Sequence, residues 1–345
     1  MNDMPEFFKN EAELEEYLSR PTQEVIDLMR DTEGDLLFLG IAGKIGPSLA
    51  RMAKRACDAA GVKKRVVGVS RFSNPHERAD LEANGIETIQ GDLLDPDFVK
   101  TLPAVPNVFF LAGMKFGAQD KLAYTWAMNT YVPALVAEHF RNSRIVAFST
   151  GCVYPLIPVE SGGSTEQDMP VAIGEYAQSC LGRERLFEYG SLRHKTAVTL
   201  VRLNYAVEMR YGVVVDIACK VYNRQPVDLT MGYFNVIWQG DMNAAVLRCL
   251  PLCSTPAQII NLTGPETLSV KETALALGAL MDKEPIFTGE EAPTALLNNA
   301  NLAHQHFGLP QVKPEIMFRW IAEWIKDDKR LLNKPTHFEE RDGKY

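Results

Sequence analysis

Short apolar runs alternate with stretches rich in helix formers along most of the chain from Asp35 onward. The runs predict strands at 36–39, 65–69, 87–89, 107–111, 144–149 and 197–202. Buried parallel strands are short, apolar and separated by helices. The pattern therefore predicts an α/β fold, a doubly wound parallel sheet with helices on both faces.

The remaining segments predict smaller units around this main domain. Residues 1–34 predict a helical extension in two parts, packed on the main domain, with a lid or an oligomer contact as the alternative. The main domain spans 35–205, and part of 231–250 returns to it. Residues 206–330 predict a smaller α/β lobe, with a strand at 258–262 and an amphipathic helix at 318–326. Residues 331–345 predict a loose tail.

Charge and hydropathy narrow the class of partner. The formal net charge is -8 at pH 7, and no long basic run occurs. These features argue against nucleic acid and against an anionic membrane surface as partners. No apolar run is long enough for a transmembrane helix, and the first residues lack an apolar signal core, so a cytoplasmic protein is expected.

The six cysteines are scattered, which suits reduced thiols and not a disulfide framework. Cys249 and Cys253 stand four positions apart without a second pair beside them. The six histidines form no metal spacing. No metal site is therefore expected.

A glycine-rich turn follows the first predicted strand. Gly40, Gly43 and Gly46 have G-x-x-G-x-x-G spacing, with Lys44 and Ile45 between the last two, and a helix-forming stretch follows. Glycine lets the backbone approach a pyrophosphate, and a helix N-terminus offers free N–H groups. The context predicts a dinucleotide cradle in a Rossmann sheet, with an ordinary strand-to-helix turn as the alternative.

The residues at the end of the second predicted strand indicate whether the dinucleotide is NAD or NADP. An acidic residue there would bind the ribose hydroxyls of NAD. This chain has Ser70 and Arg71, which suit a 2′-phosphate and favour NADP over NAD. A solvated arginine is the alternative. Further along, Asp92 and Leu93 are placed to contact an adenine.

The fourth predicted strand leads into Leu111, Ala112, Gly113, Met114 and Lys115. Small side chains there leave room for a cofactor, and Lys115 is placed to reach a phosphate.

Taken in order, these motifs resemble the extended short-chain dehydrogenases/reductases, the group that includes sugar-nucleotide epimerases and dehydratases. The resemblance covers roughly residues 35 to 326. It rests on the glycine loop, Asp92-Leu93, Ala112-Gly113-Met114-Lys115, Asn129, Ser149-Thr150, Val153-Tyr154, Tyr176, Arg202-Leu203-Asn204, Asp241 and Asn261-Leu262-Thr263-Gly264.

The resemblance implies roles for several of these residues. Thr150 would hydrogen-bond the reacting oxygen and Tyr176 would be the acid/base. Asn129 would support the helix behind the cofactor site, and Lys115 would approach the pyrophosphate. The substrate would be a sugar or sugar derivative, and the protein a homodimer.

The chain departs from the group at one catalytic position. The Y-x-x-x-K motif would place a lysine at 180, where this chain has Cys180. That lysine holds the nicotinamide ribose and lowers the pKa of the tyrosine, and a thiol does neither. With a tyrosine pKa of about 10, roughly one tyrosine in a thousand would be phenolate at neutral pH. We therefore expect any activity to favour carbonyl reduction, for which a neutral hydroxyl can donate its proton.

Cys152 is a second departure. The 4,6-dehydratases carry an Asp-Glu pair after the threonine, and Gly151 and Cys152 stand here instead, which disfavours that elimination. Cys152 and Cys180 either shape the pocket as small neutral side chains, or act as a redox pair or a thiol nucleophile. Arg183 and Arg185 are expected to pair at the surface.

Three residues begin the predicted substrate lobe: Asn204, Tyr205 and Arg210. Arg210 is a candidate for holding an anionic substrate group. The sequence thus predicts an NAD(P)-dependent oxidoreductase acting on a sugar-like molecule. A sugar epimerase with bound cofactor and a cofactor-binding sensor with little or no turnover are the alternatives.

Overall fold

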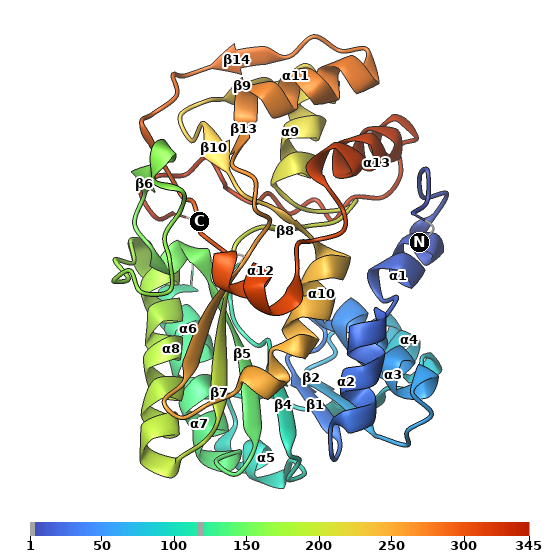
Figure 1. Ribbon diagram of the computed structural model, residues 1–345, viewed down its shortest axis with the longest axis vertical. Coiled ribbons are helices and arrows are strands. Elements are labelled where there is room, and N and C mark those ends of the chain that lie inside the picture. Colours follow the sequence, from blue (N-terminus) through green and yellow to red (C-terminus); the bar gives the residue numbers. More distant parts are fainter. Residues whose placement is uncertain (1–3, 116–120, 345) are drawn as a thin grey trace.

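A seven-stranded parallel sheet forms the centre of the computed structural model, which describes residues 4–115 and 121–344 (Figure 1). The strands lie in the order β12-β7-β5-β4-β1-β2-β3. Their bounds are β1 Leu36–Leu39, β2 Val66–Ser70, β3 Glu87–Gln90, β4 Asn107–Phe110, β5 Arg144–Thr150, β7 Val198–Leu203 and β12 Gln258–Leu262. The doubly wound α/β fold is confirmed, and the predicted strand ends differ from these by about one residue.

The strand β12 corrects the predicted division of the chain. The sequence places 258–262 in the smaller lobe, whereas β12 pairs with β7 along its whole length, from Gln258 opposite Thr199 to Leu262 opposite Leu203. Its apolar pattern gave no indication of which sheet it joins, because strand partners are set by the three-dimensional path of the chain.

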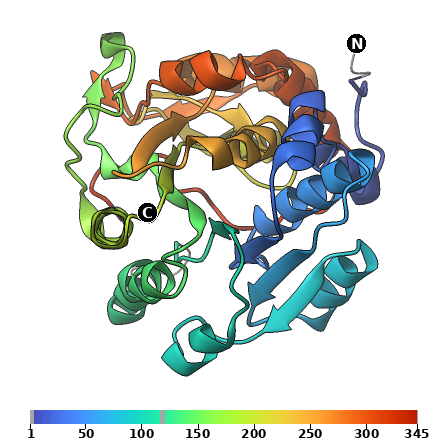
Figure 2. The same ribbon diagram turned by 60° about the horizontal axis from the view of Figure 1, so that its bottom comes forward.

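Helices cover both faces of the sheet (Figure 2). One face carries α2 Gln23–Asp31, α3 Gly46–Ala59, α4 Pro75–Ala83 and α10 Gln239–Arg248. The other carries α5 Pro96–Thr101, α6 Leu122–Trp126, α7 Val132–His139 and α8 Gly174–His194. The helix α10, which lies within 231–250, packs on α2 and α3 of the main domain.

A π-helical segment, η2 (Ala127–Tyr131), joins α6 to α7. Pro133 lacks the N–H that would bond the carbonyl of Asn129 in an α-helix. The backbone widens there, and the N–H of Val132 donates to the carbonyl of Ala127 instead. The widened turn holds Asn129, which is fully buried.

The smaller lobe lies above the carboxyl ends of the strands (Figure 1). Its core gathers apolar side chains from three helices, among them Ile217, Leu277 and Trp320. Its elements are β8 Ala206–Val207, α9 Val213–Tyr222, β9 Pro226–Asp228, β10 Tyr233–Phe234, β11 Ile237–Trp238, β13 Leu268–Ser269, α11 Val270–Met281, β14 Ile286–Thr288 and α13 Pro314–Lys326, with β6 Ile157–Pro158 pairing to β15 Thr294–Ala295 beside it. Two further elements, η5 Leu250–Leu252 and α12 Asn301–Phe307, pack on the sheet domain instead. Short 3₁₀ turns, η3 Gly151–Val153 and η4 Val159–Ser161, flank β6.

The N-terminal helices divide between the two cores. Phe8 and Leu14, before and within α1 (Glu11–Leu18), are buried in the core of the lobe, whereas Val25 and Met29 of α2 are buried against the sheet. The predicted extension is thus two helices that join the lobe to the sheet domain.

The predicted loose tail is wrong for the described residues. Phe338 is 1% exposed and belongs to the core of the lobe. The N–H and hydroxyl of Thr336 both donate to Asp216 on α9, at 2.7 and 2.6 Å. Arg341 donates to the carbonyls of Thr230 and Thr294. The charged composition of this segment concealed one buried aromatic ring and several side-chain hydrogen bonds.

Candidate functional site

Two adjoining cavities, of about 300 and 350 Å³, open at the carboxyl ends of β1, β2, β4 and β5. The strand order reverses between β1 and β4, which is where ligands bind in open α/β sheets. Both cavities are lined by Gly40, Gly43, Leu111 and Gly113.

Most of the predicted site residues meet here. Ser70, Arg71, Asp92, Leu93 and Ala112 line the smaller cavity, and Lys44, Ile45, Gly46, Lys115, Thr150, Cys152, Tyr176, Asn204 and Tyr205 line the larger one. Cys180, Asn129 and Arg210 line neither.

The three glycines of the loop have different local surroundings. At Gly40, where φ is +88°, a Cβ would lie 2.6 Å from the N of Ala112. At Gly46 it would lie 2.0 Å from the carbonyl oxygen of Ile41. At Gly43 the nearest atom would be 3.4 Å away, so the protein itself leaves space there. The first and last glycines serve the turn and the helix start, and Gly43 leaves a concave surface into which a ligand fits.

The smaller cavity carries the residues predicted for the adenosine end. The Arg71 guanidinium is exposed and donates to the Tyr124 hydroxyl at 2.7 Å. Asp92 accepts from the N–H of Leu94, and Glu77 also lines the cavity. A cation and two carboxylates thus share this cavity.

Two lysines and a tyrosine lie on the opposite side of the glycine loop. The Lys44 ammonium donates to the carbonyl of Ala206 at 3.0 Å and lies 4.1 Å from the ring centre of Tyr211. Burial lowers the pKa of Lys44 to about 7, and the charge of Lys115 lowers it further, against an opposing effect from Glu208. Lys115 hydrogen-bonds Tyr211, whose pKa burial raises.

Tyr176, the group expected to exchange a proton, also lines the larger cavity. Burial raises the pKa of Tyr176 well above its ordinary value, and its hydroxyl donates to the sulfur of Cys180, which raises that pKa further. Burial likewise raises the pKa of the Cys180 thiol to about 11 and raises that of Cys152. Burial and the two cysteines thus favour the neutral hydroxyl form of Tyr176, against an opposing effect from Arg183.

Thr150 stands beside these groups at the end of β5. Its hydroxyl accepts from the N–H of Cys152 at 3.2 Å and caps the short turn η3. A threonine and a tyrosine hydroxyl therefore line one cavity, as expected for a pair that contacts a reacting oxygen.

Asn129 lies behind the cavity and ties three elements together. Its amide accepts from the N–H of Met114 at 2.9 Å and donates to the Met114 carbonyl and to Ser179 on α8. It lines no cavity, so its contacts support the predicted bracing of the helix and not direct contact with a cofactor.

The expectation for Arg183 is wrong. This side chain is 6% exposed and lines the larger cavity, whereas Arg185 pairs at the surface with Glu188, as expected. The guanidinium of Arg183 donates to the Phe148 carbonyl at 2.9 Å and to Asn129 at 2.6 Å. The sequence signal was its spacing, since residues 176, 180 and 183 share one face of a helix.

Arg210 differs from its predicted role. Its guanidinium pairs with Glu11, Glu15 and Glu208 at 2.9, 2.7 and 3.1 Å and does not line the cavity. Two of these carboxylates come from α1, which the sequence gave no reason to place beside residue 210. The structure thus gives Arg210 the role of joining α1 to the lobe.

Asn204, another residue predicted for the substrate, borders the larger cavity. It is 2% exposed, it lines the cavity, and its amide nitrogen has no partner among the described residues. Beside it, Tyr205 has φ +47°.

Sequence reasoning missed Tyr211, Lys334 and Thr336, which also line the larger cavity. All three come from segments without a recognised motif. Two of them belong to the tail, so the cavity wall depends on contacts between distant parts of the chain.

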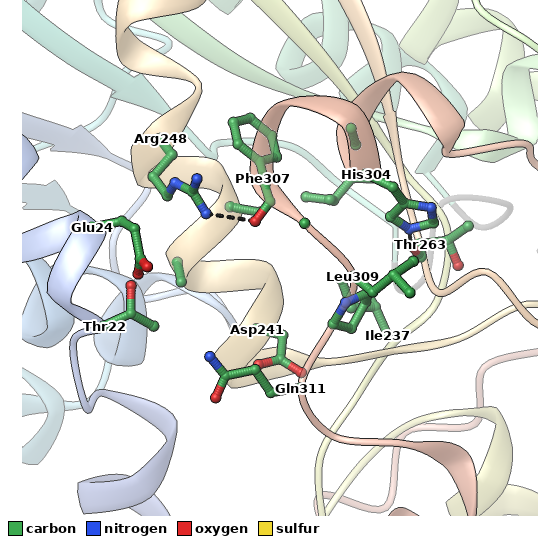
Figure 3. A pocket seen from close by; sticks show the side chains of 16 residues that line it. Thr22, Glu24, Ile237, Asp241, Arg248, Thr263, His304, Phe307, Leu309 and Gln311 are labelled. Atoms are coloured by element: carbon green, nitrogen blue, oxygen red, sulfur yellow. Dashed lines mark hydrogen bonds between the residues drawn. The ribbon is translucent and has the colours of Figure 1, made fainter. Parts of the chain in front are cut away.

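A third cavity, of about 90 Å³, lies between the N-terminal segment, α10 and α12 (Figure 3). Asp241 lines it and accepts from the N–H of Val312 at 2.9 Å. Burial raises the pKa of Asp241 to about 6. Asp241 thus holds the loop at Val312 and does not line the cavities beside the glycine loop.

The described part of the chain contains neither a cluster of metal-ligating side chains nor a membrane-spanning helix. Across residues 4–115 and 121–344, no three His, Cys, Asp or Glu side chains gather as metal ligands would. No helix in those ranges has the length and apolarity needed to span a bilayer.

Comparisons with solved structures agree with this architecture. MoeE5 in complex with UDP-glucose and NAD superimposes with a TM-score of 0.69 at 19% identity, over 86% of this chain and 99% of that one. UDP-glucuronic acid 4-epimerase from Bacillus cereus, in complex with NAD, gives a TM-score of 0.72 at 17% identity, over 86% and 100%. UDP-glucose 4-epimerase from Thermotoga maritima, with UDP-glucose, gives 0.70 at 16%, over 85% and 99%.

At these identities the likeness concerns the fold. No protein-family model matches the chain, and no curated protein matches it in sequence. The chain therefore has the Rossmann-like α/β fold of these sugar-nucleotide enzymes.

Proposed function

We propose that the protein is an NAD(P)-dependent oxidoreductase that reduces a carbonyl group of a sugar or sugar derivative. The observation that carries the proposal is the continuity of one cavity. It runs from the open surface at Gly43 to the hydroxyls of Thr150 and Tyr176. A ligand that fills it would touch both the glycine loop and the proton donor.

The residues present fit a dinucleotide. The loop from Gly40 to Gly46 and the N-terminus of α3 would hold the pyrophosphate, with Lys44 and Lys115 as its cations. Ser70, Arg71 and Asp92 would hold the adenosine end. The nicotinamide, when bound, would supply the hydride for the carbonyl carbon.

Tyr176 would give its hydroxyl proton to the carbonyl oxygen, while Thr150 would orient that oxygen by a hydrogen bond. Both the burial of Tyr176 and its contact with Cys180 keep the hydroxyl protonated, which suits a proton donor. The same features make Tyr176 a poor base for alcohol oxidation. The reductive direction is thus the one that this site favours at neutral pH.

The sugar class rests on the structural neighbours, three of which carry UDP-sugars or act on them by name. Those names also support a second candidate, a 4-epimerase that oxidises and reduces the same carbon with bound cofactor. The raised pKa of Tyr176 supports a third, a cofactor-binding sensor with little turnover.

The test is turnover by the full chain with NADPH or NADH and a panel of keto sugars and keto sugar nucleotides. We expect NAD(P)H oxidation with at least one member of the panel. Tyr176→Phe should reduce that rate by about 10²–10⁴-fold without changing cofactor affinity. Tight cofactor binding with no turnover would favour the sensor. Interconversion of epimers without added cofactor would favour the epimerase.

We propose NADP as the preferred form because Ser70 and Arg71 line the cavity, although the neighbours that name a cofactor name NAD. Arg71→Ala should weaken NADP binding and leave NAD binding unchanged, because only the 2′-phosphate needs the cation. The carboxylates of Glu77 and Asp92 in the same cavity would repel a 2′-phosphate and so act against this preference. Tighter binding of NAD than of NADP by the unaltered protein would contradict it.

The homodimer implied by the family resemblance is also a proposal. It is supported by exposed apolar side chains: Tyr131 of η2 is 46% exposed, and Tyr189 and Leu192 of α8 are 57% and 55% exposed. Sedimentation of the full chain tests it, and a monomer at all concentrations would contradict it.

A further inference from the structure

A buried cation lies on the same helix face as Tyr176, one turn beyond Cys180. Residues 176, 180 and 183 stand at i, i+4 and i+7 of α8, so their side chains follow one another along one face. Tyr176 and Arg183 both line the larger cavity, and Cys180 is fully buried between their positions.

The charge of Arg183 is not neutralised by any carboxylate in the described part of the chain. The nearest acid in sequence, Glu184, pairs with Arg202 through two hydrogen bonds of 2.9 and 2.7 Å. Arg183 contacts only neutral acceptors, the Phe148 carbonyl and the Asn129 amide, and its Nε has no partner among the described residues.

The surrounding elements make room for this guanidinium. A Cβ at Gly113 would lie 2.3 Å from Nη2 of Arg183, so the glycine after β4 keeps the space open. The guanidinium carbon also lies 5.8 Å from the ring centre of Phe110. An unpaired buried cation is costly, and it is favourable only where it meets negative charge.

We propose that Arg183 supplies, from the next turn of α8, the fixed positive charge that residue 180 lacks, and so stabilises the Tyr176 phenolate formed during proton transfer. The inference rests on the proposed function. When the Tyr176 O–H bond breaks and its proton passes to the substrate oxygen, the electron pair stays on the phenol oxygen. Arg183 acts through Tyr176 and is a positioning residue.

The other groups that face Tyr176 do not supply this charge. Cys180 on α8 and Cys152 after β5 both raise the pKa of Tyr176, whereas Arg183 lowers it. Lys115, from the loop after β4, acts on Cys152, and Glu184 acts on Cys180. Among the largest effects on the pKa of Tyr176, the one that comes from a cation is that of Arg183.

The decisive measurement is the ionisation of residue 176 in the full chain without cofactor. Difluorotyrosine placed at 176 brings the phenol pKa into an accessible range, and its ¹⁹F resonance reports the phenolate. Arg183→Gln removes the charge but keeps donors for Phe148 and Asn129. We expect it to reduce the phenolate fraction at a given pH by about tenfold. Arg183→Lys should keep most of it.

A matched control lies on the same helix. Arg185→Met removes one positive charge at the surface, and we expect no change in the ¹⁹F titration. An Arg183→Gln titration that coincides with that of the unaltered protein would overturn the inference. Thermal unfolding of each variant verifies that it folds, and Arg183→Lys provides the charged comparison if the glutamine variant is unstable.

Kinetics supply an independent second test. If Arg183 and a lysine at 180 both stabilise the Tyr176 phenolate, each can replace the other. Cys180→Lys should then raise the reduction rate of the Arg183→Gln variant by a larger factor than it raises the rate of the unaltered protein. Equal factors in both backgrounds would contradict the inference. A shift in the ¹⁹F titration without turnover on any substrate would refute the proposed oxidoreductase alone, whereas turnover without a shift would refute the role of Arg183 alone.

Discussion

At the scale of single residues, the site combines a protonated tyrosine with cations of unequal character. Tyr176 is held neutral by burial and by its contact with Cys180. Arg183 is buried and pairs with no carboxylate among the described residues. Lys44 can lose its proton near neutral pH. The chemistry of the cavity should therefore depend on pH through Tyr176 and Lys44 separately.

The first prediction concerns the direction of reaction. Because the pKa of Tyr176 is raised above about 10, its hydroxyl stays protonated through the neutral range and reduction keeps its proton donor. Oxidation needs the phenolate, whose fraction rises about tenfold per pH unit below that pKa. We expect oxidation to increase steadily into the alkaline range in matched pH–rate profiles. An oxidation optimum at neutral pH would contradict this expectation.

The second prediction concerns Lys44. With a pKa of about 7, Lys44 is protonated below that pH and neutral above it. An anionic cofactor favours the charged form, so its affinity should fall as pH rises above 7, and binding there should take up a proton. Calorimetry in buffers of different ionisation enthalpy measures that uptake. Lys44→Met should abolish it, whereas a proton uptake that survives the substitution would assign it to another group.

At the scale of elements, the glycine loop and the helix that follows it perform two tasks that can be separated. Gly46 lies against the carbonyl of Ile41 and starts α3, whereas Gly43 borders the open cavity. The first task belongs to folding and the second to ligand binding.

We therefore expect opposite results from two similar substitutions. Gly43→Ala should leave the thermal unfolding midpoint unchanged and weaken cofactor binding by roughly tenfold or more, because its Cβ occupies space that a pyrophosphate needs. Gly46→Ala should lower the midpoint itself, since its Cβ would lie 2.0 Å from a backbone oxygen. Unaltered cofactor affinity in Gly43→Ala would contradict the cradle.

Sequence patterns predicted those parts of the molecule that depend on local rules. The sheet strands from 36 to 203 are apolar runs of ordinary length, except for the half-polar edge strand β3, and the glycine loop has its own spacing. Arg183 was misplaced because a charged residue on a helix is usually solvated, and only the tertiary contacts of Asn129 and Phe148 bury it. Arg210 was misplaced for a similar reason, because two of its three carboxylate partners, Glu11 and Glu15, lie about 200 positions away in the chain.

At the scale of the whole molecule, the larger cavity is enclosed by segments from both ends of the chain. The glycine loop comes from the sheet domain, Tyr211 from the lobe, and Lys334 and Thr336 from the tail. The tail is held by Phe338 in the core of the lobe and by the bonds of Thr336 to Asp216. Its end returns to the start of α8, where Gly343 packs against Gly174 (Figure 1).

This arrangement predicts a local effect for Phe338→Ala. Loss of a buried phenylalanine costs about 3–5 kcal/mol in a core. Because Phe338 packs in the core of the lobe and not against the sheet, we expect amide exchange to accelerate in residues 333–344 and to stay unchanged in β1, β4 and β5. Hydrogen-exchange mass spectrometry measures both. Faster exchange throughout the sheet would contradict a separable tail.

The tail also affects how long a ligand stays bound. A ligand in the larger cavity would have Lys334 and Thr336 as part of its wall, so detachment of the tail would remove contacts that retain it. Its residence time would then follow the frequency with which a short C-terminal segment detaches, and not only the strength of its own contacts. A substitution at Phe338, which lines neither the cofactor cavity nor the cavity with Tyr176, would shorten that time.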